Sequence, residues 1–122
     1  MPGADFTIEI MARWFSEDEV EGLDPKLVQM LDAARGFAHC PFIITSGYRT
    51  QGHNEAIGGV PNSAHTRGLA VDIQCNGSRS RFLMVSALIL AGFRRIELAP
   101  RHIHADVDPD LPQDVIWFGE SR

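Results

Sequence analysis

The run HIHADV, from residue 102 to residue 107, alternates polar and apolar side chains and constrains the fold more than any other segment. Side chains two residues apart on a β-strand point to the same face of a sheet. The run therefore predicts a strand that buries Ile103, Ala105 and Val107. The opposite face of this strand carries three polar side chains: His102, His104 and Asp106.

A second strand is predicted at LAVDI, residues 69–73, where Asp72 faces away from the core. A half-buried carboxylate is costly unless a cationic group meets it. His65 lies seven residues earlier, and Gly68 between the two allows the sharp or left-handed turn that would bring them together. A simple glycine turn explains Gly68 equally well.

Two core-facing helices are predicted from the spacing of apolar residues. The first begins at Asp24 and Pro25, an N-cap and first-turn signature, and continues to about His39. The second lies between Ser78 as N-cap and Gly92 at its C-terminal end. The residues expected to face the core are Leu27, Met30, Leu31, Ala34 and Phe37 in the first helix and Phe82, Leu83, Val85, Leu88 and Ile89 in the second.

The remaining elements complete an α+β fold. FIIT at 42–45 predicts a short strand, and the polar, glycine-rich segment that follows predicts a long functional loop. FRRIEL at 93–98 and the run at 102–107 predict two strands of a hairpin, with Pro100 between them. Because helices and strands do not alternate strictly, we expect a small, mainly antiparallel sheet packed with helices.

Length and composition predict a single domain over residues 1–122, and we expect a monomer. No apolar run approaches the roughly 20 residues needed to span a bilayer, and the first 20 residues lack the layout of a secretory signal. The net charge of −5 argues against a nucleic-acid binder. Cys40 and Cys75 do not have metal or redox spacing, and free thiols are expected, although a disulfide between them stays open.

Imidazoles and carboxylates without thiolates form a ligand set that suits zinc. His65 and Asp72, together with the strand face of His102, His104 and Asp106, offer two or three imidazoles and one or two carboxylates. A purely structural role explains His65, Asp72 and His104 poorly, whereas His39 and His53 are isolated and are interpreted as surface residues. Three protein ligands would leave one position for water, which zinc can turn into a hydrolytic nucleophile near neutral pH.

Three segments, SGYRT, HNEAIGGVPNSAHTRGLAVDI and HIHADV, together resemble the zinc D-alanyl-D-alanine carboxypeptidase family of metallopeptidases, most closely its small muramoyl-peptide carboxypeptidase branch. The resemblance extends from about residue 23 to residue 107. It implies a hedgehog/DD-peptidase-like fold, Zn²⁺ held by His65, Asp72 and His104, and a substrate-facing Arg49. His102 matches a second histidine of the carboxypeptidase branch.

One position departs from related enzymes, which carry a general-base glutamate three residues before the last zinc ligand. Arg101 stands there in this chain. Two groups remain for proton transfer: His102, which shares a strand face with His104, and Glu97, a weaker candidate because its use depends on the register of the hairpin. Asp106 and Ser63 are candidates for orienting the metal ligands through hydrogen bonds to them. For Asp106, a solvent-facing position at the end of the strand is equally open.

The resemblance implies a zinc peptidase that hydrolyses a bond in peptidoglycan stem peptides, either by trimming a terminal D-alanine or by opening a cross-link. It also implies a substrate at the bacterial cell wall and a bacterial or bacteriophage origin, while the compartment stays open. A rival hypothesis is a non-catalytic zinc domain that binds wall fragments or a protein partner, since a metal site can outlive its activity. A metal-free structural protein is a weaker hypothesis because it leaves Asp72 unexplained.

Overall fold

One five-stranded sheet, in the order β1-β2-β4-β3-β5, organises the computed structural model, which describes residues 12–59 and 63–119. Antiparallel pairing joins β1 to β2, β2 to β4 and β4 to β3, and β5 alone is parallel to its neighbour β3. The strands are β1 (Ile44–Ser46), β2 (Ala70–Gln74), β3 (Arg95–Leu98), β4 (His102–Asp106) and β5 (Val115–Phe118). The predicted α+β class with a mainly antiparallel sheet is therefore confirmed.

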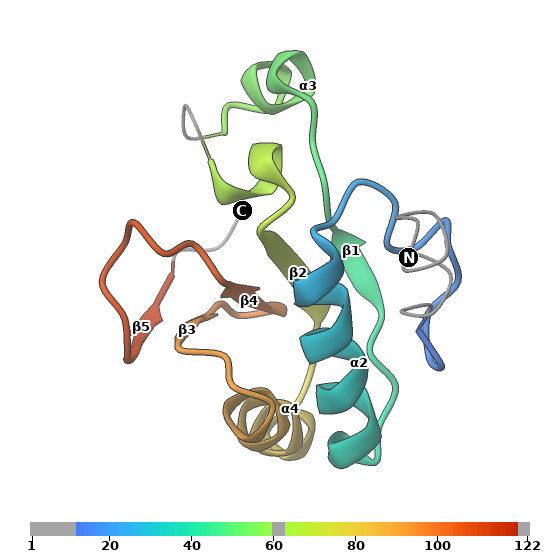
Figure 1. Cartoon of the computed structure of the whole chain (residues 1–122). Helices are drawn as coiled ribbons and strands as arrows, with labels where there is room; N and C mark the ends of the chain where they lie inside the picture. Colours follow the sequence, from blue (N-terminus) through green and yellow to red (C-terminus); the bar gives the residue numbers. More distant parts are fainter. Residues whose placement is uncertain (1–11, 60–62, 120–122) are drawn as a thin grey trace.

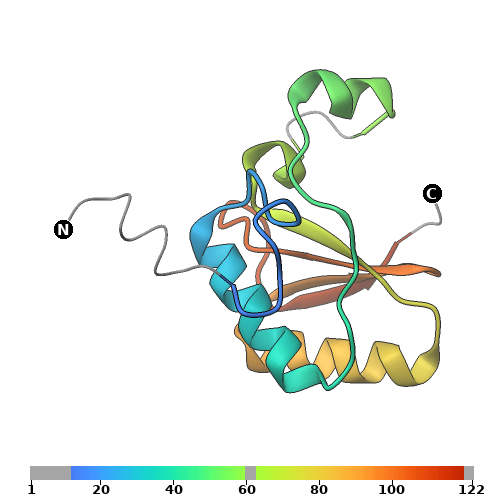
Figure 2. The same ribbon diagram turned by 90° about the vertical axis from the view of Figure 1, so that its right-hand side faces the viewer.

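The helices divide between the two faces of the sheet. The long helices α2 (Pro25–Ala38) and α4 (Ser78–Leu90) pack together against one face, as Figures 1 and 2 show. The short helix α3 (Gln51–Ala56) and the 3-10 helix η1 (Ala64–Arg67) lie on the other side, with α3 standing away from the rest of the domain (Figure 2). One face of the sheet is therefore covered by helices, and the other is left largely free for polar side chains.

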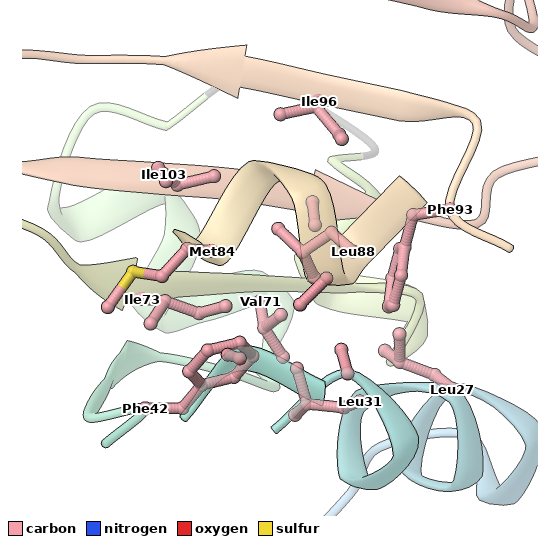
Figure 3. Packing of buried hydrophobic residues seen from close by; sticks show 14 of the residues in the cluster. Leu27, Leu31, Phe42, Val71, Ile73, Met84, Leu88, Phe93, Ile96 and Ile103 are labelled. Atoms are coloured by element: carbon pink, nitrogen blue, oxygen red, sulfur yellow. The ribbon is translucent and has the colours of Figure 1, made fainter. Parts of the chain in front are cut away.

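The hydrophobic core lies between the two long helices and the sheet (Figure 3). Leu27 and Leu31 of α2 and Leu88 of α4 are fully buried against strand residues such as Ile73 and Ile103. Each large apolar side chain that is buried in this way stabilises the fold by about 1.5–3 kcal/mol. The core thus fixes which face of β2 and β4 points inward.

Helix α4 confirms the predicted core positions Leu88 and Val85, but its buried face is turned from the predicted one at other positions. Met84, Ala87 and Leu88 are buried, whereas Phe82 is 71% and Ile89 52% exposed. The helix is apolar on more than one side, so spacing alone could not select the buried face. Its N-cap is Gly77, one residue before the predicted Ser78.

Helix α2 follows the prediction except at its C-terminal end. Phe37 was predicted to face the core but is half exposed. His39 ends the helix as the C-cap in a left-handed conformation, and its side chain is exposed, as is that of His53. Both histidines therefore lie on the surface, as predicted.

The segment predicted as a long loop, residues 46–63, contains α3, and η1 begins directly after it. Each short helix begins with a hydroxyl cap: Thr50 Oγ1 accepts a hydrogen bond from His53 N, and Ser63 Oγ accepts one from His65 N. Such caps satisfy backbone donors that an uncapped turn would leave unpaired. Residues 60–62 of this segment, like the terminal residues 1–11 and 120–122, lie outside the described part of the chain.

Two further predictions can be compared with the structure. Cys40 and Cys75 are free thiols, as expected. Across the described ranges, no helix has both the length and the apolar character needed to cross a membrane.

Gly68 makes the closest backbone approach between η1 and the segment that enters α2. It has φ +72°, and a Cβ atom on Gly68 would lie 2.4 Å from Gly22 O. Gly68 O in turn accepts a hydrogen bond from Asp24 N at 2.9 Å. Only glycine fits both the left-handed backbone and this contact.

We expect Gly68→Ala to lower the free energy of unfolding by about 2 kcal/mol or more, because it adds a backbone clash to the cost of a left-handed alanine. Gly58→Ala is the matched control, since Gly58 has φ +73° and, apart from its chain neighbours, no atom of the described residues lies within 4 Å of its ideal Cβ. Denaturant unfolding measures both variants. Equal losses of stability would show that the contact between Gly68 and Gly22 contributes nothing.

Candidate metal centre

The register of the sheet lines up four functional side chains across its open face. Asp72 on β2 lies opposite His104 on β4, His104 lies opposite Glu97 on β3, and Glu97 lies opposite Trp117 on β5. Directly opposed residues in antiparallel strands have Cα atoms about 4.5–5.5 Å apart. Their neighbours in sequence, such as Val71 and Ala105, point into the core, so this row faces away from α2 and α4.

His65 reaches this row from η1. Ser63 Oγ accepts a hydrogen bond from His65 N at 3.2 Å, and His65 O accepts one from Arg49 N at 3.1 Å, so the backbone of the turn is held from both sides. Gly68 ends η1 in the left-handed conformation and lets the chain enter β2. The predicted convergence of His65 and Asp72 is therefore present, with Nε2 of the histidine 3.5 Å from Asp72 Oδ1.

A backbone carbonyl selects which ring nitrogen of His65 is available. His65 is 4% exposed, and its Nδ1 lies 2.8 Å from Gly47 O. A carbonyl oxygen only accepts hydrogen bonds, so Nδ1 carries the proton in this contact. The lone pair of the neutral ring is then on Nε2, the atom that faces Asp72.

In His104 the ring is held through Nε2, and not through Nδ1 as in His65, and the partner is a carboxylate. Its Nε2 lies 2.7 Å from Asp106 Oδ2, and its Nδ1 lies 3.0 Å from Asp72 Oδ1. Because an ionised carboxylate only accepts hydrogen bonds, Nε2 donates to Asp106. Nδ1 also meets a carboxylate in the metal-free site, and it is the His104 atom that would give up its proton to bind a metal beside Asp72.

The charges of the site depend strongly on one another. Burial alone would raise the pKa of Asp72, but hydrogen bonds from His104 and His65 outweigh it and lower this pKa well below its usual range. Burial alone would lower the pKa of His104, but the carboxylates of Asp106 and Asp72 raise it to about 9. With no metal bound, His104 is therefore a cation between two carboxylates at neutral pH.

His65, Asp72 and His104 form a group that could hold a metal ion. Each offers one ligand atom, and these atoms lie within 4.8 Å of one another. Two imidazole nitrogens and one carboxylate oxygen, with no thiolate, match the three protein ligands of catalytic zinc sites. The residues present therefore fit zinc, and the cation that Asp72 requires would be either this metal or a protonated histidine.

The other predicted site residues lie around this group. Glu97 flanks His104 across the hairpin, and His102 lies two residues before His104 on the same strand face. Arg49 is half-buried, and its Nη2 lies 3.5 Å from Ser63 Oγ. Ser63 contacts the backbone of His65 and not its ring, whereas Asp106 contacts the ring of His104 directly.

Sequence reasoning missed two residues that contact this site. Arg95 donates to Asp106 Oδ1 from Nε at 2.7 Å, and its guanidinium lies over the ring of Trp117. Arg95 occupies the same strand face as Glu97, so the alternation of FRRIEL could have identified it. Trp117 lies on β5, and the run VIWF that forms this strand was the overlooked signal.

Comparison with known proteins identifies the family. Residues 4–106 match the family model described as Peptidase M15, whose members are zinc-dependent peptidases. No curated protein matches the chain significantly. The match spans most of the chain and agrees with the resemblance of the SGYRT, SAHTRGLAVDI and HIHADV segments. This chain belongs to the peptidase M15 family of zinc metallopeptidases.

Proposed function

We propose that this protein is a peptidoglycan hydrolase that cleaves a peptide bond in stem peptides. The bond would be a terminal D-alanyl-D-alanine bond or a cross-link of the kind that endolysins open. The observation that carries the proposal is the group of His65, Asp72 and His104 on the open face of the sheet, in a chain of the peptidase M15 family.

The zinc ion would be held by His65 Nε2, a carboxylate oxygen of Asp72 and His104 Nδ1. When bound, zinc supplies a Lewis acid that activates water and polarises the scissile carbonyl. The hydrogen bond partners of the two imidazoles support this assignment, because Gly47 O and Asp106 occupy the nitrogens that face away from Asp72. One nitrogen of each ring, His65 Nε2 and His104 Nδ1, is thus left on the side of Asp72 to bind the metal.

Glu97 and His102 are the two candidates for proton transfer. The hairpin register, which the sequence left open, favours Glu97, because its Cα lies directly opposite that of His104. His102 lies on the same strand face but two residues before His104 on β4, where it is paired with Gln74. We assign the proton transfer to Glu97 and keep His102 as the alternative.

Arg49 would stabilise negative charge on the substrate. It precedes α3 and is linked through its backbone to His65 and through its guanidinium to Ser63. A planar guanidinium can hold a carboxylate or a developing oxyanion by two parallel hydrogen bonds. This connection to η1 supports a role for Arg49 at the same edge of the site.

A non-catalytic zinc domain remains the second candidate function. It is favoured by one observation, the exposed Arg101 at the position where related enzymes carry their general base. Incubation of the protein with defined muropeptides, followed by mass spectrometry, separates the two functions. New product masses identify the bond that is cut, whereas retained but uncleaved muropeptides identify a binder.

We expect about one zinc ion per chain after the protein is supplied with zinc and the excess is removed. Asp72→Ala should lose most of this zinc, because it removes the carboxylate that lies between both imidazoles. His53→Ala is the matched control, since it removes an exposed histidine of α3 and should keep the metal. Elemental analysis measures all three proteins, and equal zinc content in the two variants would contradict the assigned site.

Glu97→Gln should lower kcat by about 10²-fold or more while zinc content stays unchanged, because the amide cannot accept a proton. His102→Ala serves as the comparison on the same sheet face. Steady-state hydrolysis of a stem-peptide substrate measures both. If His102→Ala loses this activity and Glu97→Gln keeps it, His102 is the residue that transfers the proton. If both variants keep full activity, another group transfers it.

A further inference from the structure

Arg95 is a buried cation that the proposed reaction does not use. Only 7% of the residue is exposed. Its Nε donates to Asp106 Oδ1 at 2.7 Å, and its Nη1 donates to Pro112 O at 2.5 Å. A buried guanidinium is costly unless its donors are satisfied and an opposite charge is close. These partners meet that requirement from one strand, β4, and one loop.

The two oxygens of Asp106 have separate partners. Oδ1 accepts from Arg95 and from Asp108 N, the latter at 3.1 Å, while Oδ2 lies 2.7 Å from His104 Nε2. Two donors on one oxygen fix the plane of the carboxylate, so the second oxygen is aimed at the histidine. Asp108 is itself held by Arg67 of η1.

Trp117 covers this arrangement from β5. The Arg95 guanidinium carbon lies 4.8 Å from the centre of the indole ring, and the rings of Trp117 and His104 are 6.2 Å apart. A cation over an indole face is a favourable contact, and more so where water is excluded. Strand β5 follows the residues 4–106 that match the family model, so this cover comes from the C-terminal part of the chain.

We propose that Arg95, covered by Trp117, is a positioning residue for the metal ligand His104. Arg95 orients Asp106, Asp106 holds His104 Nε2, and Nδ1 is thereby left facing Asp72. Without the guanidinium, Asp106 Oδ1 would lose one of its two donors and keep Asp108 N, so the plane of the carboxylate would no longer be fixed toward His104. His104 would then lose the contact that decides which of its nitrogens meets the metal. This inference rests on the proposed zinc site.

The first test is zinc affinity, measured by competition with a chromophoric chelator. Arg95→Met should weaken zinc binding by about 10- to 100-fold, the usual size for loss of a group that orients a ligand. Arg94→Met is the matched control, because it removes the same charge one residue earlier, from an exposed ion pair with Asp114. Arg94→Met should bind zinc as the wild type does.

Arg95→Lys tests whether charge alone suffices. Lysine can pair with Asp106 but cannot also reach Pro112 O with a second fixed donor. We expect the zinc affinity of Arg95→Lys to lie between that of the wild type and that of Arg95→Met. If Arg95→Met does not fold, as judged by circular dichroism, Arg95→Lys and Trp117→Leu still decide the matter. Zinc affinities of both variants within twofold of the Arg94→Met value would overturn the proposal.

The second test does not depend on zinc. NMR spectra of the metal-free wild type, with ¹⁵N-labelled histidine, should show a slowly exchanging Nε2–H proton on His104. Arg95 variants should lose or broaden this signal, whereas Arg94→Met should keep it. An unchanged signal in the Arg95 variants would overturn the proposal. The His104 signal could be lost in the Arg95 variants while the wild type binds no zinc. That result would refute the proposed function and leave intact the role of Arg95 in positioning His104.

Discussion

The carboxylate of Asp72 is the charge around which the site is built. It lies between two imidazoles, 3.5 Å from His65 Nε2 and 3.0 Å from His104 Nδ1, and both contacts lower its pKa. A carboxylate at this depth is stable only beside a cation. The surrounding structure supplies that cation in two forms, as a protonated His104 or as a metal held by all three residues, and the second form requires each ring to present the correct nitrogen.

The division of the sheet into two faces makes this arrangement compatible with a small domain. Helices α2 and α4 cover the face that carries Val71, Ile73 and Ile103, so burial of apolar surface fixes the orientation of β2 and β4. The alternation of side chains then places Asp72 and His104 on the opposite face. The hydrophobic core therefore determines the geometry of a polar site that contributes little to the core.

The sequence was sufficient for features that depend on local pattern. The alternation in HIHADV and LAVDI predicted β4 and β2, and the resemblance of these motifs to the zinc carboxypeptidase family implied that His65, Asp72 and His104 would meet. Features that depend on long-range pairing were out of reach. The opposition of Glu97 and His104 needs the hairpin register, and the contact between Arg95 and Trp117 needs a parallel pairing of β3 with β5, which no local pattern encodes. The buried face of α4 was predicted only in part, at Leu88 and Val85, because that helix is apolar on more than one side.

Diffraction from crystals of the zinc-loaded protein, collected on both sides of the zinc absorption edge, tests the central claim most directly. The account predicts one anomalous peak, with His65 Nε2, an oxygen of Asp72 and His104 Nδ1 each about 2.0–2.2 Å from the metal, and with Asp106 still bonded to His104 Nε2. A peak bound by His104 Nε2, or one centred on His102 and away from Asp72, would contradict it.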